Sequence, residues 1–346
     1  MENKEVLLRV ENLCQYFGPV KAVDNVSFDI KKGEVFGLVG ESGCGKTTTG
    51  RSIIKIYDIT SGSIYFNGKR ICAGTKAYHD EIAACRREMK ENPEKADACK
   101  ARIAQLKAEI KQAKCDHAAS GMVTDIQMIF QDPIASLNPR MTVKEIISEG
   151  LVIQGMKDQK AIDEKVYEIL ELVGLVREHA GRYPHEFSGG QRQRIGIARS
   201  VIMHPELLIA DEPISALDVS IQAQVINLLN DLRNTLDLTI LFIAHDLSVV
   251  KYFSDRIGVM YFGKLVELAP ADELFAHPLH PYTKSLLSAI PLPDPHSEKQ
   301  RVRITYDVAA AHDYSQEAPT MREVAPGHFV YCNEAEEKAF KEEMGL

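Results

Sequence analysis

Short apolar runs rich in β-branched residues alternate with glycines over the first 75 positions of the chain. Runs of this length, bounded by turn residues, are typical of β-strands. The pattern therefore predicts strands at residues 6–10, 23–30, 35–39 and 63–67.

The segment 76–117 has a different pattern, with few β-branched residues and many alanines, lysines and glutamates. Its apolar residues recur at spacings of three and four, which places them on one face of a helix. A break at Asn92-Pro93 divides them into two sets, and Pro93 fits the first turn of a second helix. We predict a hairpin of two antiparallel helices, whose apolar stripes are Tyr78, Ile82, Cys85 and Met89, then Cys99, Ile103, Leu106, Ile110 and Ala113.

Strand and helix patterns alternate from residue 121 to 290. Strands are predicted at 125–130, 207–210 and 239–244, and helices near 143–154 and 160–173. The last 56 residues show little periodicity. The chain is thus predicted to hold an α/β domain at 1–75 and 118–290, an inserted helical hairpin at 76–117 and a C-terminal extension at 291–346.

The composition is that of a folded protein, with 45% hydrophobic and 26% charged residues. The 41 Lys and Arg against 49 Asp and Glu give a net charge of −8, so the basic surface expected of a nucleic-acid-binding protein is not indicated. No apolar run approaches the roughly 18 residues of a membrane span. The N-terminus lacks the apolar core of a secretory signal, and seven irregularly spaced cysteines argue against a disulfide framework. These features predict a cytoplasmic protein.

Residues 40–47 match the phosphate-loop pattern G-x-x-x-x-G-K-[ST] directly after the predicted strand 35–39. Glycines let the backbone curl so that its N–H groups point at phosphate oxygens, and the next helix presents its positive N-terminal end. We expect Lys46 to bind the β- and γ-phosphates and the Thr47 hydroxyl to ligate Mg²⁺. The candidate nucleotide-binding residues are Gly40, Glu41, Ser42, Gly43, Cys44, Gly45, Lys46, Thr47 and Thr48.

Two carboxylates follow the apolar run 207–210, which is typical of a strand buried on both faces. Alone, such a strand end more often just meets solvent. Beside a phosphate loop, Asp211 is predicted to hold Mg²⁺ through water and Glu212 to polarise the attacking water as a general base.

A second anion cradle precedes the helical run 195–202 and consists of Ser188, Gly189, Gly190 and Gln191. Ser-Gly-Gly at a helix start offers backbone N–H groups to an anion, but this cradle has no lysine of its own. Two cradles with one lysine predict a nucleotide held between two copies of such a domain.

With this segment in place, the sequence resembles the ATP-binding cassette (ABC) ATPases, whose signature is usually Leu-Ser-Gly-Gly-Gln; Phe187 stands in the Leu position. The resemblance covers residues 5–290 apart from the hairpin. It implies a P-loop cassette with a RecA-like core, an antiparallel β subdomain and an α-helical subdomain. It also implies ATP and Mg²⁺ as ligands and a second ABC ATPase subunit as partner.

The resemblance assigns further residues. Gln131 matches the glutamine that reaches Mg²⁺ and the attacking water, and His245 matches the switch histidine at the γ-phosphate. Asp218 ends the loop 215–218 that lies across the dimer interface. The expected catalytic residues are Lys46, Gln131, Glu212 and His245, and the expected metal ligands are Thr47, Gln131 and Asp211.

The family stacks adenine on an aromatic ring before the first hairpin. Alignment on Gly18 favours Phe17 for this role, and Tyr16 remains open. Stacking on either ring gives affinity with little base specificity.

Residues 130–143 and 277–287 look like the dipeptide/oligopeptide importer ATPases, and most like the second of their two ATPase subunits. This implies transmembrane permease subunits as partners, a solute-binding protein acting through them, and a place at the cytoplasmic face of the membrane. The cargo could also be nickel or another small solute. Whether the second cassette is identical to this one or different also stays open. A soluble ABC ATPase acting on DNA or ribosomes is the other alternative, against which stand the single cassette, the acidic balance and the importer-like C-terminal motifs.

Importer ATPases of this group often carry a cysteine-rich C-terminal motif that can hold an iron–sulfur cluster. The corresponding stretch 306–332 contains only Cys332, and one thiolate cannot bind a four-cysteine cluster, so no cluster is predicted.

The hairpin region allows two interpretations. Its cysteines and histidine are spaced unlike any zinc motif, so small core side chains are the better interpretation. The hairpin itself either docks a regulator or partner subunit or is a tolerated surface insertion. The residues concerned are Cys72, Cys85, Cys99, Cys115 and His117.

Overall fold

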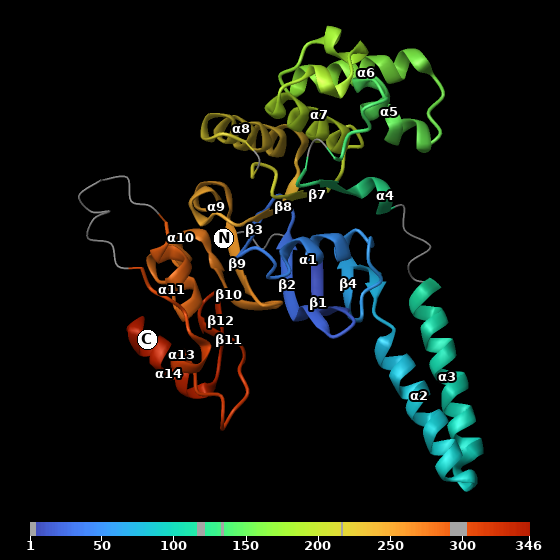
Figure 1. Ribbon diagram of the computed structural model, residues 1–346, viewed down its shortest axis with the longest axis vertical. Helices are drawn as coiled ribbons and strands as arrows, with labels where there is room; N and C mark the ends of the chain where they lie inside the picture. Colours follow the sequence, from blue (N-terminus) through green and yellow to red (C-terminus); the bar gives the residue numbers. More distant parts are fainter. Residues whose placement is uncertain (1–4, 116–121, 133–134, 216, 291–302) are drawn as a thin grey trace. The chain divides into compact units, whose positions relative to one another are not determined.

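The computed structural model describes residues 5–115, 122–132, 135–215, 217–290 and 303–346. The chain forms two compact units (Figure 1). The first comprises residues 1–32, 43–121 and 262–264, and the second comprises residues 33–42, 122–261 and 265–346.

An antiparallel sheet in the order β2-β1-β4-β5 forms the first unit. Leu8, Leu13 and Val26 are buried on its inner face. The strands run further than the sequence pattern predicts, because bulges let β1 keep pairing beyond residue 10. The bounds are β1 Val6–Phe17, β2 Val20–Lys31, β4 Ser61–Phe66 and β5 Lys69–Ala73. Helix α1, Lys46–Ile53, follows the phosphate loop.

The predicted hairpin is present in this unit as α2, Lys76–Glu91, and α3, Ala96–Cys115, which pack side by side (Figure 1). Ile82, Cys99 and Leu106 from the two apolar stripes are buried. Pro93 does not begin α3; it opens a separate 3-10 turn, Pro93–Lys95, between the helices.

An eight-stranded sheet in the order β11-β12-β10-β9-β3-β8-β7-β6 forms the second unit. The five strands β6, β7, β8, β3 and β9 run parallel. Strands β3, β7 and β8 are buried along their whole length, which explains why nearly all of their residues are apolar. The bounds are β3 Val35–Val39, β6 Ile126–Ile129, β7 Leu207–Asp211, β8 Thr239–Ala244, β9 Arg256–Tyr261 and β10 Lys264–Pro270.

Helices of this unit share a hydrophobic core with the sheet. Among them, α5, α6 and α7 form a separate group (Figure 1). A capping box between Thr142 and Glu145 starts α5. The bounds are α4 Met122–Asp125, α5 Val143–Ile153, α6 Gln159–Leu172, α7 Gly189–Val201, α8 Val219–Leu236, α9 Leu247–Phe253, α10 Ala271–Ala276 and α11 Pro281–Ser288.

The C-terminal extension contains structure that the sequence pattern did not predict. Strands β11, Thr320–Ala325, and β12, His328–Cys332, pair antiparallel, and β12 also pairs with β10. Short helix α13, Val308–Ala311, and helix α14, Glu334–Glu343, complete the extension. The tail therefore continues the main sheet.

Among the helices that the structure describes, none is both long and apolar enough to cross a bilayer.

Candidate active site

The predicted catalytic residues of the second unit all follow parallel strands. Because β3, β6, β7 and β8 run in one direction, their carboxyl ends meet at one edge of the sheet. Gly40 follows β3, Gln131 follows β6, Glu212 follows β7 and His245 follows β8. Topology thus brings together residues that are up to 205 positions apart in the sequence.

Glu212 is the centre of this edge. Gln131 Nε2 donates to Glu212 Oε2 at 3.0 Å, and His245 Nδ1 lies 3.3 Å from the same oxygen. The Glu212 side chain is 11% exposed and that of His245 is 54% exposed. The Glu212 backbone has a φ of 45°, a left-handed conformation that few residues other than glycine adopt. Its N–H donates to Ile243 O at 2.9 Å, which anchors this turn on β8.

A cavity of about 50 Å³ opens beside Glu212 and His245, with Ser215 and Gln222 among its lining residues. A buried water needs roughly 10–15 Å³, so a water molecule fits next to the Glu212 carboxylate.

Asp211 is fully buried at the end of β7. Carboxylate, hydroxyl and amide oxygens are the hard ligands that Mg²⁺ prefers, so Asp211, Thr47 and Gln131 fit this ion by their chemistry. Gln131 bonds Glu212 through its side-chain nitrogen, and its carbonyl oxygen takes no part in that hydrogen bond. Within the described ranges, no group of three or more His, Cys, Asp or Glu side chains is arranged to hold a metal ion.

The phosphate loop has the backbone that its glycines allow. Gly40, Gly43 and Gly45 have φ values of 148°, 81° and 107°. A Cβ on Gly43 would meet no atom within 4 Å, so space does not restrict this position. The positive φ of its backbone is what favours glycine there. Gly45 is the N-cap of α1, and a helix N-terminus favours an anion. Lys46 is only 3% exposed, and its Nζ lies 3.7 Å from Cys44 Sγ.

Tyr282 of α11 is a contact of this loop that the sequence analysis missed. The Glu41 N–H donates to the Tyr282 hydroxyl at 3.0 Å, and Tyr282 is 2% exposed. The C-terminal part of the second unit therefore holds the start of the phosphate loop. The importer-like segment 277–287 contains this tyrosine, but its sequence does not indicate the contact.

Phe17 and Tyr16 differ in their surroundings. Phe17 is 43% exposed and packs edge-on against Tyr57. Tyr16 donates its hydroxyl proton to Asp24 Oδ1 at 2.6 Å, and burial raises the pKa of its phenol. Phe17 is therefore the ring with a face open to a ligand.

The signature segment caps α7. Ser188 Oγ accepts from Gln191 N–H, and Gln191 Oε1 accepts from Ser188 N–H, which forms a capping box. A Cβ on Gly190 would lie 2.7 Å from Ile221, so the approach of α8 requires glycine there. Phe187 is 4% exposed and packs edge-on against His179, so the aromatic ring fills the leucine position as a core side chain.

Asp218 caps α8, accepting from the Ile221 N–H at 3.1 Å and the Ser220 hydroxyl at 2.8 Å. The Ser220 hydrogen bond and the Ile221 N–H lower the pKa of its carboxyl. Ala216, inside the loop 215–218, lies outside the described residues.

Comparison with known proteins assigns the family. A family model described as ABC transporter matches residues 23–122 and 102–215, and a second, the oligopeptide/dipeptide transporter C-terminal region, matches residues 266–317. The chain is 57% identical over 341 residues to the oligopeptide transport ATP-binding protein OppF of Bacillus subtilis, covering 97% of this chain and 99% of that protein. The chain belongs to the ATP-binding subunits of ABC transporters.

Two further comparisons agree. The dipeptide transport ATP-binding protein DppF of Lactococcus lactis is 49% identical over 354 residues, covering 100% of both chains. The solved structure of cbiO1 from Clostridium perfringens, part of the ABC transporter complex cbiONQ, has a TM-score of 0.59 and 25% identity, covering 79% of this chain and 92% of that one. The family and fold predicted from the sequence are confirmed, and the chain is an ABC-type ATPase.

Arg199 is a second residue of the cassette that the sequence analysis missed. Its guanidinium donates to Ser136 O at 2.6 Å, and burial lowers its pKa. The next residue, Ser200, donates to Met128 O at 3.2 Å. Helix α7 thus begins at the signature segment and, near its other end, holds the loop after Gln131.

The cysteines of the cassette are buried or half-buried thiols. Cys72 and Cys99 are 5% and 6% exposed, and both are free. Cys332 is fully buried on β12, and burial raises the pKa of its thiol to about 12. The Cys115 side chain and all of His117 lie outside the described residues.

Proposed function

We propose that this chain binds ATP with Mg²⁺ and hydrolyses it to drive an importer of short peptides. The observation that carries the catalytic part is the convergence of Gln131 and His245 on one oxygen of Glu212 beside a water-sized cavity. The peptide cargo rests on likeness to relatives named for oligopeptide and dipeptide transport.

Glu212 acts as the general base in this proposal. Its carboxylate accepts a proton from water in the adjacent cavity, so the water attacks the γ-phosphate as a stronger nucleophile. Gln131 and His245 orient the carboxylate and contact the nucleotide side of the centre. A bound Mg²⁺ would neutralise phosphate charge, held by Thr47, Asp211 and Gln131.

The phosphate loop holds the polyphosphate. The backbone of residues 40–48 supplies N–H groups, and the ammonium of Lys46 supplies the charge for the β- and γ-phosphates. Adenine stacks on Phe17, because that ring is exposed and the Tyr16 hydroxyl is engaged by Asp24.

A second cassette completes each site. Ser188, Gly189, Gly190, Gln191 and Asp218 of the partner face the γ-phosphate across a dimer interface. A cradle without a lysine binds an anion well when the opposing loop brings Lys46. This arrangement predicts two ATP molecules per cassette pair.

Permease subunits complete the importer at the cytoplasmic face of the membrane, and a solute-binding protein delivers cargo to them. The loop after Gln131 is the proposed contact with the permease, and Arg199 ties that loop to the signature helix. Movement of a permease at this loop would therefore reach the signature segment through α7.

The test is to co-purify the chain with its permease subunits, reconstitute the complex in liposomes and measure ATP turnover. Oligopeptide delivered with its binding protein should raise turnover severalfold, and the Glu212→Gln complex should bind ATP without turnover. Stimulation by nickel alone, or stimulation of the chain by DNA or ribosomes without the permease, would overturn the proposal.

A further inference from the structure

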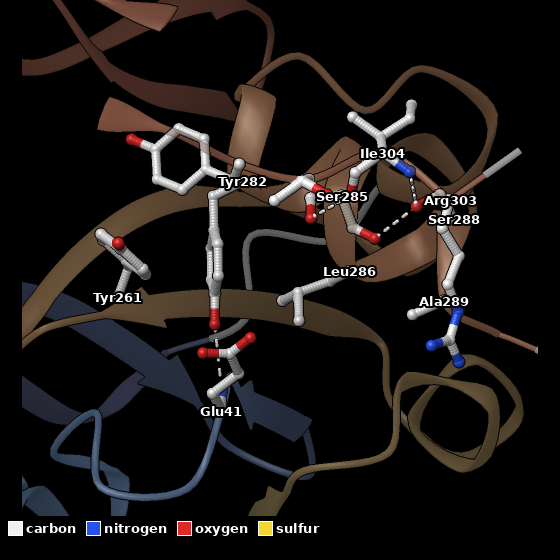
Figure 2. A pocket seen from close by; sticks show the side chains of 11 residues that line it. Glu41, Tyr261, Tyr282, Ser285, Leu286, Ser288, Ala289, Arg303 and Ile304 are labelled. Carbon is white, nitrogen blue, oxygen red and sulfur yellow. Dashed lines mark hydrogen bonds between the residues drawn. The ribbon is translucent and has the colours of Figure 1, made fainter. Parts of the chain in front are cut away.

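A pocket of about 320 Å³ lies beside α11 in the second unit (Figure 2). Pockets that hold small molecules have volumes of roughly 300–1,000 Å³, so this one is large enough for a small metabolite. It is separate from the Glu212 cavity and shares no lining residue with it. Its lining includes Glu41, Tyr261, Tyr282, Leu286, Arg303 and Tyr306.

Aromatic rings form one wall of the pocket. The Tyr261 and Tyr282 ring centroids are 4.4 Å apart, and the Tyr306 centroid is 5.1 Å from that of Tyr261. Leu286 and Ile304 add apolar surface to the lining. Such a wall favours an apolar side chain and, on the ring faces, a cation.

Hydrogen bonds hold the wall in place. Ser285 Oγ donates to Ile304 O at 2.7 Å, and Ile304 N–H donates to Ser288 Oγ at 3.0 Å. The Tyr306 hydroxyl lies 2.9 Å from His312 Nε2. The pocket is thus preformed, so a ligand need not order its lining.

The pocket has opposite charges at two sides. Glu41 lies below the Tyr282 hydroxyl, and Arg303 lies across the pocket beside Ala289 (Figure 2). Both residues are exposed to solvent and line the pocket. Among the described residues, no carboxylate lies within ion-pair distance of the Arg303 guanidinium. A carboxylate at one side and a guanidinium at the other are complementary to a ligand with both charges.

We propose that this pocket binds a small zwitterion with an apolar side chain, that is, an amino acid or a short peptide. Its ammonium lies at Glu41 and over the tyrosine faces, its carboxylate pairs with Arg303, and its side chain packs on Leu286 and Ile304.

The pocket is coupled to the phosphate loop through Glu41. This residue is the second of the loop, and its N–H is held by Tyr282, a pocket wall. An ammonium at Glu41 neutralises a carboxylate carried by the loop that binds polyphosphate, so ATP is repelled less. Occupancy should lower the KM for ATP, and ATP should tighten zwitterion binding by the same factor. This coupling would let the chain sense imported cargo, and that role rests on the proposed function. The binding site itself does not depend on the proposed function.

The binding test uses the purified full-length chain without permease and isothermal titration calorimetry. The probes are phenylalanine, glycyl-phenylalanine and N-acetyl-phenylalanine amide, which keeps the ring but has neither charge. The first two should bind, and their relative affinity tells an amino-acid site from a peptide site. Arg303→Ala should weaken binding at least tenfold, whereas Lys338→Ala, an exposed α14 cation paired with Glu334, should leave it unchanged.

The coupling test measures the KM for ATP with and without the bound probe. Wild type should show at least a twofold decrease, and Tyr282→Phe should bind the probe but show a smaller decrease. Absence of binding up to about 10 mM probe, equal binding of the blocked amide, or unchanged binding by Arg303→Ala would overturn the site. Because no permease is present, a failed transport assay leaves these results standing, and failure here leaves peptide transport standing.

Discussion

Two glutamate–histidine pairs in the second unit have the same chemistry but different access to solvent. Glu212 and His245 lie 3.3 Å apart at the carboxyl edge of the sheet, with the histidine 54% exposed. Glu267 on β10 and His328 on β12 lie 2.8 Å apart, with both side chains fully buried. Access to a cavity, rather than the residue types, separates the proposed catalytic pair from the buried one.

The carboxylate of the sealed pair has three hydrogen-bond partners. Glu267 accepts from the Leu279 and His280 N–H groups at 2.8 and 3.1 Å, in addition to His328. Its carboxylate therefore holds the turn before α11 against β10 and β12. Glu212, in contrast, has the side chains of Gln131 and His245 as partners, and a cavity adjoins it.

The largest expected effect is on the open pair. Glu212→Gln removes the base but keeps the shape, so turnover at saturating ATP should fall about 10³-fold. The free energy of unfolding in urea should change by less than about 1 kcal/mol, since the side chain reaches a cavity. Turnover near the wild-type rate would contradict the assigned base.

The sealed pair should respond in the opposite way. Glu267→Leu leaves His328 and two backbone N–H groups buried without their acceptor, which should cost about 3 kcal/mol of unfolding free energy. Urea denaturation measures this loss. Turnover per folded molecule should be retained; a loss of turnover with full stability would show that this pair is not purely structural.

Acid should act through His280. Burial, helped by His312, lowers the pKa of His280 to about 3, whereas the unfolded value is 6.5. The unfolded chain therefore binds this proton first, and the group's contribution to stability is lost as pH falls from 6.5 towards 3, by about 1.4 kcal/mol per unit. His280→Asn keeps the cap of α11 but does not titrate, so its unfolding free energy should fall less steeply over this range. Equal slopes for the two proteins would contradict the buried neutral imidazole.

The smallest effect concerns the phosphate loop. Tyr282→Phe removes the hydroxyl that accepts from the Glu41 N–H and should raise the KM for ATP about fivefold, consistent with about 1 kcal/mol for one hydrogen bond. Turnover at saturating ATP should change little. Tyr331→Phe, which changes a tyrosine of β12 in the C-terminal extension, serves as control.

Glu212 and His245 could be singled out from the sequence because each follows a short, mostly apolar run, at residues 207–210 and 239–244. The hairpin was equally predictable, since its stripe from Ile82 to Leu106 repeats at helical spacing. Alignment on Gly18 already favours Phe17 over Tyr16, but the hydrogen bond that engages the Tyr16 hydroxyl could not be predicted, because Asp24 lies in another strand. Arg199, Tyr282 and the Glu267–His328 pair were missed because each acts through a contact between distant segments. Strands β11 and β12 are short and mixed in polarity, and their structure depends on the pairing of β12 with β10 and of β11 with β12.

The central claim is that His245 acts through Glu212 on one hydrolytic step. Its most direct test is ATP turnover of the reconstituted complex in a cycle of His245→Ala, Glu212→Gln and the double variant. Because residues that act as a unit are not additive, His245→Ala should slow the wild-type complex by at least tenfold but the Glu212→Gln complex by less than about twofold. An equal slowing in both backgrounds would contradict the account.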